Sequence, residues 1–159
     1  MIDDLKRSNF FAGFDDKSLA DVAAFARPRT FEAGEIVFDR DEEGHRAYII
    51  LSGRVRQGFE VSPGSEVWFL TGEPGDLFGF GALIPPRVRA MRAKASERTE
   101  VVELDADALL EYLESHPHFG FIFMERLARV IYQRLNNSRL QIVHLMPERE
   151  VAGPTLDRG

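Results

Sequence analysis

The residues best suited to bind a small charged molecule lie in the middle of the chain. Residues 77–96 contain no acidic side chain, but they include four basic ones: Arg87, Arg89, Arg92 and Lys94. Just before them, residues 75–83 read GDLFGFGAL. Gly79 and Gly81 allow backbone conformations that direct successive N–H groups into one concavity, which suits an anion. A following guanidinium can bind a phosphate through two charge-assisted hydrogen bonds. The pattern predicts an anion site, although a glycine turn followed by arginines that pair with surface acids would look the same.

Composition narrows the class of protein that could carry such a site. The chain has 159 residues, of which 44% are apolar and 29% charged, as in one globular domain with a full core. Its net charge of −6 gives no general attraction for DNA or anionic lipid. The absence of cysteine excludes disulfides, thiolate metal sites and a cysteine nucleophile. With no long apolar stretch and no secretory signal at its start, we expect a cytoplasmic protein without membrane contact.

The histidines do not form a recognisable catalytic group. His45, His116, His118 and His144 are the only ones, and only residues 116–118 give a His-x-His pair of the kind that metal-binding cupins use. Pro117 favours a helix start there, whereas cupin ligands lie on a barrel strand. We therefore predict no enzyme activity, no metal and no cofactor. Haem sensing through a histidine such as His45 is an alternative that the absence of a Soret band would exclude.

The elements that must position the candidate site change type along the chain. Residues 14–28 predict a short helix with Ser18 as its N-cap and Pro28 as its stop. From 29 to 104, short apolar runs alternate with glycines, which is typical of strands and turns. The predicted strands are 35–38, 46–51, 54–61, 66–70 and 99–104. Many short strands without intervening helices indicate an antiparallel sandwich or barrel, which disfavours a parallel nucleotide-binding sheet.

Two helices are predicted after the strands. Asp105 can cap a helix through Glu114, and Pro117 suits the first position of a second helix that reaches about Leu145. The second helix would be about 43 Å long, more than a small sandwich needs as a cover. Apolar or small residues follow it in alternating steps of four and three, namely Met124, Ala128, Ile131, Leu135, Ser138, Ile142 and Leu145. This seam predicts a parallel helix-to-helix homodimer. Alternatively, it docks on the protein's own core together with Phe121, Leu127, Val130 and Leu140.

These elements suggest one domain over residues 1–146. It would comprise the helix at 14–28, the strands at 29–104 and the helices at 105–146. Residues 147–159 contain two prolines and little apolar content, so we predict a disordered tail there.

Four segments of the sequence carry a resemblance to a known family. FEAGEIVF (31–38), YIILSGRV (48–55), GDLFGFGAL with the later Arg89, and SERTEVVEL (96–104) resemble the cyclic nucleotide-binding domain. This domain is shared by the catabolite activator protein family and the regulatory subunits of protein kinase A. The resemblance, which extends from residue 5 to about 145, implies a mainly β fold with some α: an eight-stranded antiparallel jelly-roll barrel with a short N-terminal helix. It also implies two C-terminal helices, of which the longer dimerises in bacterial activators.

The resemblance implies functional residues as well. Phe78, Gly79, Ala82 and Leu83 match the family's phosphate-binding cassette, and Arg89 stands where its phosphate-binding arginine does. Arg87 or Arg92 could take that role if the hairpin register differs. The implied ligand-binding residues are Gly79, Phe80, Gly81, Ala82, Leu83, Arg89, Ala90, Ser138 and Arg139. The last two fall where bacterial activators contact the purine, although Ser138 is also compatible with the helix seam and Arg139 with a solvated surface.

The cassette departs from the family at two positions. Phe80 replaces the glutamate that accepts a hydrogen bond from the ribose hydroxyl, and Ala90 replaces a serine or threonine. Together these losses would weaken nucleotide binding about 30- to 1,000-fold. The family's usual Gly-Asp turn after its second strand is also replaced, by Asp41 and Glu42.

Two hypotheses about function follow. The first is a regulatory sensor domain that binds an anionic ligand such as cAMP or cGMP and signals to an effector protein through its C-terminal helices. The second is a jelly-roll dimerisation or interaction module that has lost nucleotide binding. Bacterial activators carry a helix-turn-helix domain after the long helix, whereas here only residues 146–159 follow. We therefore expect no direct DNA binding by this chain, which could be a stand-alone protein or part of a longer regulator.

Overall fold

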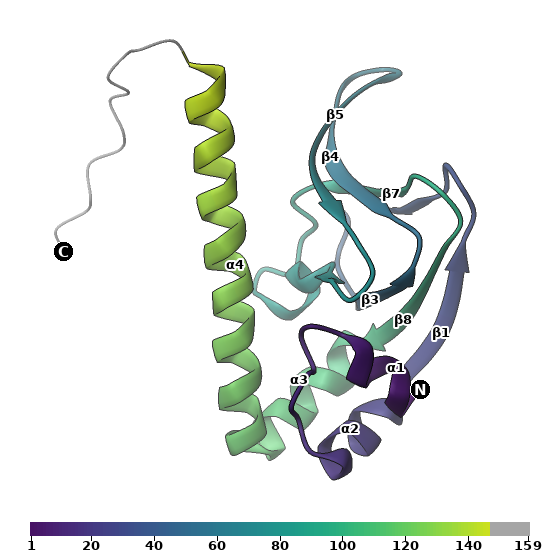
Figure 1. Ribbon diagram of the computed structural model, residues 1–159, viewed down its shortest axis with the longest axis vertical. Helices are drawn as coiled ribbons and strands as arrows, with labels where there is room; N and C mark the ends of the chain where they lie inside the picture. The colour runs from purple at the N-terminus through teal and green to yellow at the C-terminus, as the bar shows by residue number, and fades with distance from the viewer. Residues whose placement is uncertain (147–159) are drawn as a thin grey trace, which may run out of the picture. The chain divides into compact units, whose positions relative to one another are not determined.

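The β-strands form two antiparallel four-stranded sheets (Figure 1). The computed structural model describes residues 1–146, so the predicted tail at 147–159 lies outside the described residues. One sheet has the order β1-β8-β3-β6 and the other β2-β7-β4-β5. The strands are β1 (Ala26–Phe31), β2 (Ile36–Phe38), β3 (Arg46–Ser52), β4 (Val55–Ser62), β5 (Ser65–Gly72), β6 (Leu77–Phe78), β7 (Arg92–Ala95) and β8 (Thr99–Asp105). This arrangement confirms the predicted eight-stranded jelly roll.

The core of the jelly roll is built from alternate residues of both sheets. Because side chains alternate across a strand, each sheet turns one set of residues inward. Buried members from the first sheet include Phe31, Ile50 and Val101, and the second sheet contributes Val55 and Ala95. Stacked aromatic rings belong to this core, with those of Tyr48 and Phe78 only 4.9 Å apart. The candidate anion site is built directly over these rings.

The N-terminal region differs from its prediction. A helix not predicted from the sequence, α1 (Ile2–Arg7), precedes α2 (Asp16–Ala23). The N-cap of α2 is Asp15 and not Ser18, because the Asp15 carboxylate accepts hydrogen bonds from both the backbone and the hydroxyl of Ser18. Pro28 does not stop the helix but lies in β1. As β1 is an edge strand, the missing N–H of a proline is tolerated there.

The C-terminal helices begin where the sequence predicts. Asp105 caps α3 (Ala106–Ser115) by accepting from the backbone N–H groups of Asp107 and Ala108, and α4 runs from Pro117 to Leu145. The chain forms two compact units, Met1–Met124 and the part that begins at Glu125. The first turns of α4 belong to the first unit, where the rings of Phe123 and Phe10 lie 4.8 Å apart. Among residues 1–146, no helix is long and apolar enough to cross a membrane.

Candidate functional site

The glycine-rich segment forms a tight reversal between β6 and a short 3₁₀ helix, η1 (Phe80–Leu83). Gly79 adopts a left-handed conformation with φ of 70°, whereas η1 is right-handed. A change of hand of this kind can turn successive N–H groups towards one side. In this structure the Ala82 N–H donates to the Gly79 carbonyl at 3.2 Å. A Cβ atom at Gly79 would lie 3.0 Å from the Tyr48 ring and 3.1 Å from Arg89 Nη1. Both the backbone conformation and the available space therefore require glycine.

Arg89 lies beneath this reversal and is directed inwards. Only 4% of the surface of Arg89 is exposed. Nη1 donates a 2.6 Å hydrogen bond to the carbonyl of Gly79, and Nη2 donates a 2.7 Å bond to the carbonyl of Arg46. The guanidinium carbon also lies 4.0 Å from the centre of the Phe38 ring, in cation–π geometry. The fold thus positions the positive charge of Arg89 against the aromatic ring of Phe38 and beside the reversal at Gly79.

The charge of Arg89 has no acidic partner within residues 1–146. Its side chain donates two hydrogen bonds, both to backbone carbonyls, and its buried Nε makes no hydrogen bond. Burial lowers the pKa of the guanidinium, and Tyr48 and Glu42 oppose that effect. Because the pKa is lowered on balance, these two groups compensate the burial only in part, and a bound anion would offset the remaining cost. The arrangement therefore fits a site for a negatively charged ligand.

The other three basic residues of the segment are paired. Arg87 Nη1 lies 2.7 Å from Asp107 Oδ1, and Lys94 Nζ lies 3.1 Å from a Glu66 oxygen. Arg92 contacts three carboxylates, those of Asp39, Glu60 and Glu66. Surface acids therefore pair with these three bases, as the alternative interpretation expects. Arg87 also has a buried atom without a hydrogen-bond partner, Nη2, but unlike Arg89 it already has a carboxylate partner.

A glycine that the sequence analysis did not single out completes the site. A Cβ atom at Gly44 would lie 3.0 Å from Ala82 Cα and 3.1 Å from Arg89 Cζ. Hydrogen bonds between 41–44 and 87–89 hold this segment in place, including Arg89 N to Glu42 O at 2.8 Å. Asp41 takes a left-handed φ of 69°, which aspartate tolerates better than most residues. The turn without the family's glycine therefore still forms.

Comparison with known proteins supports the family resemblance. The sequence model described as "Cyclic nucleotide-binding domain" matches residues 28–116, more than half of the chain. The chain belongs to this family. A relative in Mycobacterium tuberculosis, named as a CRP-like cAMP-activated global transcriptional regulator, is 30% identical over 142 residues, which cover 89% of this chain and 62% of the relative. This cyclic nucleotide-binding domain thus spans less than two thirds of that relative's length.

Solved structures show the same fold. A putative cyclic nucleotide-binding protein from Geobacter metallireducens superposes on this cyclic nucleotide-binding domain with a TM-score of 0.75 and 25% identity, covering 84% of this chain and 96% of its own. The Thermus thermophilus catabolite activator protein gives a TM-score of 0.70 and 25% identity, over 87% and 63% of the two chains.

Among the predicted cassette residues of this cyclic nucleotide-binding domain, Gly79 contacts Arg89 directly, because its carbonyl accepts a hydrogen bond from Nη1. Ala82 and Leu83 are buried, whereas Phe80 and Gly81 are half-buried and Ala90 is exposed. Ser138 and Arg139 belong to the second unit, where both are exposed and the Ser138 hydroxyl donates to the Arg134 carbonyl. Their contact with a purine stays a prediction.

Two histidines of this cyclic nucleotide-binding domain lie beside an aromatic ring or a carboxylate. His116 follows α3 and its ring stacks on Tyr112 at 3.9 Å. His45 Nε2 lies 3.7 Å from Glu43. Within residues 1–146, no three potential ligands are grouped in a way that could hold a metal ion.

Proposed function

We propose that this domain is a regulatory sensor that binds a cyclic nucleotide through its phosphate and signals through its C-terminal helices. The observation that carries this proposal is Arg89, a buried guanidinium that has an unpaired Nε and no carboxylate partner among residues 1–146. The M. tuberculosis relative is named as cAMP-activated, which supports cAMP as the first ligand to test, with cGMP as the second.

In this proposal the phosphate occupies the concavity formed by the Gly79 reversal and η1. Arg89 supplies the charge, and backbone amides near Gly81, Ala82 and Ala90 supply further donors. The Ala82 N–H would have to leave the Gly79 carbonyl, to which it donates at 3.2 Å. Charge-assisted bonds of this kind are shorter and stronger than neutral ones. Phe80 offers no acceptor to the ribose, so we expect a weaker site than one that carries glutamate there.

Calorimetric titration of the 159-residue chain with cAMP, cGMP and cyclic di-GMP tests the proposal. In Arg89→Gln, we expect the affinity for the nucleotide that binds to fall about 10- to 150-fold, the equivalent of about 1.5–3 kcal/mol. The matched control is Arg98→Gln, because Arg98 is an exposed arginine with a single ion pair, to Glu32. Equal affinity in wild type and Arg89→Gln would refute the role of Arg89.

The signalling part of the proposal rests on two links between the site and α3. Arg87 connects the Ala82 carbonyl to Asp107 in the first turn of α3. Arg46, whose carbonyl accepts from Arg89, pairs through its side chain with the α3 cap, Asp105, at 2.7 Å. A ligand shifts a conformational equilibrium only if its contacts differ between the two states. Both links would change if residues 84–91, the connection between η1 and β7, moved when the ligand binds.

We further propose that two copies associate through α4. The seam residues described above are all exposed in the single chain: Met124, Ala128, Ile131, Leu135, Ser138, Ile142 and Leu145. Burial of these apolar side chains against a second copy would supply the hydrophobic free energy for a dimer.

A second candidate function is an interaction module without nucleotide binding, acting on an effector protein. It is favoured by the two carbonyls that already accept hydrogen bonds from Nη1 and Nη2 of Arg89, and by the apolar Phe80. A chain that dimerises but gives no heat with any of the three nucleotides, even after Phe80→Glu, would support this second function.

A further inference from the structure

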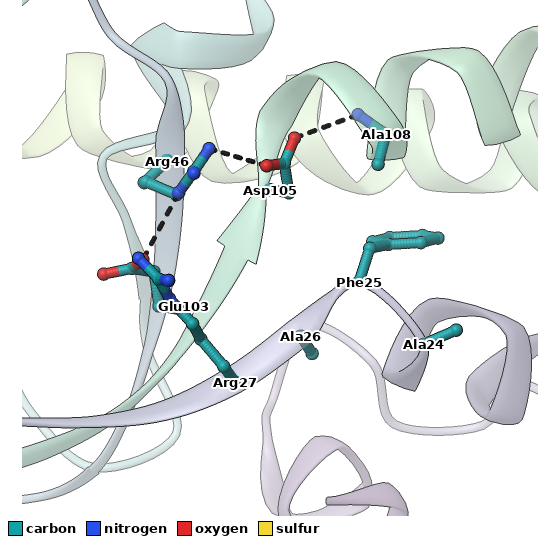
Figure 2. Close-up of a pocket in the computed structure, with 8 residues that line it drawn as sticks. All are labelled: Ala24, Phe25, Ala26, Arg27, Arg46, Glu103, Asp105 and Ala108. Carbon is teal, nitrogen blue, oxygen red and sulfur yellow. Dashed lines mark hydrogen bonds and ion pairs between the residues drawn. The ribbon is translucent and has the colours of Figure 1, made fainter.

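A separate cavity of about 330 Å³ lies at the end of the first sheet, between the α2–β1 connection and α3 (Figure 2). None of the η1 residues lines it, so it is distinct from the site at Arg89. Its volume is at the lower end of the range typical of small-molecule sites. In Figure 2, Arg27, Arg46 and Glu103 lie on the left, Asp105 lies in the middle, and Phe25, Ala24 and Ala108 lie on the right.

The charged wall exposes its positive groups more than its negative ones. Glu103, which is 1% exposed, pairs with Arg27, Arg29 and Arg46, and Asp105 pairs with Arg46 as well. Arg29 does not line the cavity, so the lining holds two guanidiniums against two carboxylates, and of these four groups the Glu103 carboxylate is the least accessible. Arg27 is the most exposed of the three arginines, with 62% of its side chain accessible. Its remaining N–H groups can therefore reach a ligand in the cavity.

The opposite wall is apolar. Phe25 is half-buried, with its ring 6.0 Å from that of Tyr112, and Ala108 of α3 adds a small side chain that leaves room beside it. Ligand sites commonly combine an apolar wall with a few well-placed polar groups. A guanidinium opposite an aromatic ring selects a molecule with a negative head and a flat or aliphatic body.

We propose that this cavity binds a small organic anion, with its carboxylate or phosphate on Arg27 and its apolar part against Phe25. Binding here does not depend on nucleotide binding at Arg89. Arg46 is nevertheless common to both places, since its side chain lines the cavity and its carbonyl accepts from Arg89.

Benzoate is a suitable probe because it combines a carboxylate with a ring. Isothermal titration calorimetry would compare it with benzylamine, which reverses the charge, and with acetate, which lacks the ring. We expect benzoate to bind and both other compounds to bind at least tenfold more weakly. Failure of benzoate to bind the wild-type chain, or equal binding of benzylamine, would overturn the proposal.

Two variants locate the benzoate site. Arg27→Gln removes the charge and should weaken benzoate at least tenfold, whereas Arg98→Gln, the control at an exposed arginine, should not. Ala108→Leu fills the cavity without changing any charge, so it keeps the test valid even if Arg27→Gln perturbs folding. Benzoate binding that survives both Arg27→Gln and Ala108→Leu would refute the site.

A third variant separates this proposal from the nucleotide site. Arg89→Gln should leave benzoate binding intact while it weakens cAMP. If Arg89→Gln abolishes benzoate binding, the anion occupies the nucleotide site and the second site does not exist. If benzoate binds but no nucleotide does, the proposed function fails and this cavity stands.

Discussion

Arg89 differs from its basic neighbours in its environment rather than in its chemistry. It is buried and bonds only to carbonyls, whereas Arg87, Arg92 and Lys94 each contact a carboxylate. An ion pair with an internal acid would satisfy the charge permanently and leave nothing for a ligand to offset. The fold instead keeps the guanidinium dry and incompletely hydrogen-bonded, which is the condition under which an added anion contributes most.

The two departures from the family cassette give a prediction of increased affinity. The double variant Phe80→Glu with Ala90→Ser restores the acceptor for the ribose hydroxyl and a hydroxyl beside Arg89. We expect the affinity for cAMP to rise about 30- to 1,000-fold, measured by calorimetry. Phe80→Leu is the control, since it changes the side chain without adding an acceptor. No gain in the double variant would mean that the ligand does not lie in the family orientation.

Gly44 gives a prediction about stability. In Gly44→Ala the new methyl group would lie about 3 Å from Ala82 and from Arg89, so one of them must shift. Crowding of this kind costs about 1–3 kcal/mol, which urea unfolding would measure. Gly81→Ala is the matched control, because its Cβ would meet only the Val88 carbonyl, at 3.8 Å. Equal stabilities of the two variants would show that the chain relaxes around Gly44.

At the scale of elements, the ion pair between Arg87 and Asp107 connects the segment between η1 and β7 to α3. The Arg87 side chain lowers the pKa of Asp107 below its ordinary value of 3.8. Because the fold favours the ionised carboxylate, the pair stabilises the fold fully above that ordinary value. The stabilisation is lost as the pH falls through the lowered pKa.

The corresponding prediction compares wild type with Asp107→Asn across pH. We expect wild type to have the higher melting temperature at pH 7, and the difference to shrink as the pH falls below about 4. Glu111→Gln, on the same helix, serves as the control. A difference that persists unchanged at pH 2.5 would show that the asparagine perturbs α3 for reasons other than charge.

Elements with a strong local pattern could be predicted from the sequence, and others could not. The regular apolar spacing and Pro117 are enough to predict α4 with its observed bounds. In contrast, β1 has charged residues at Arg27 and Arg29, whose partner Glu103 lies more than 70 positions away in the sequence. Similarly, β7 turns only Ala93 and Ala95 inwards. Long-range pairing defines these strands, and no local periodicity reports it.

The candidate site was predictable to a similar degree. Its glycines and Arg89 are visible in the sequence because the family motif places them close together. Gly44 stands 45 residues before Arg89, and its close approach to that side chain exists only in three dimensions. The sequence indicated the cavity beside Glu103 only through the position of that acidic residue within an apolar run.

At the scale of the whole molecule, the exposed seam of α4 predicts a dimer. Ile131→Glu introduces a charge within the seam, and we expect this variant to sediment as a monomer at concentrations where wild type is dimeric. Tyr132→Glu is the control, since Tyr132 is 63% exposed but lies off the seam. A dimer that survives Ile131→Glu would place the interface elsewhere.

The contrast between a buried Arg89 and a largely exposed Arg27 has a consequence for ionic strength. Dissolved ions screen the field of an exposed charge over a Debye length of about 10 Å at 0.1 M salt, and they screen that of a buried charge much less. Added sodium chloride should therefore release an anion held by Arg27 long before it releases one held by Arg89. A salt series on the unmodified protein would distinguish the two sites without any substitution.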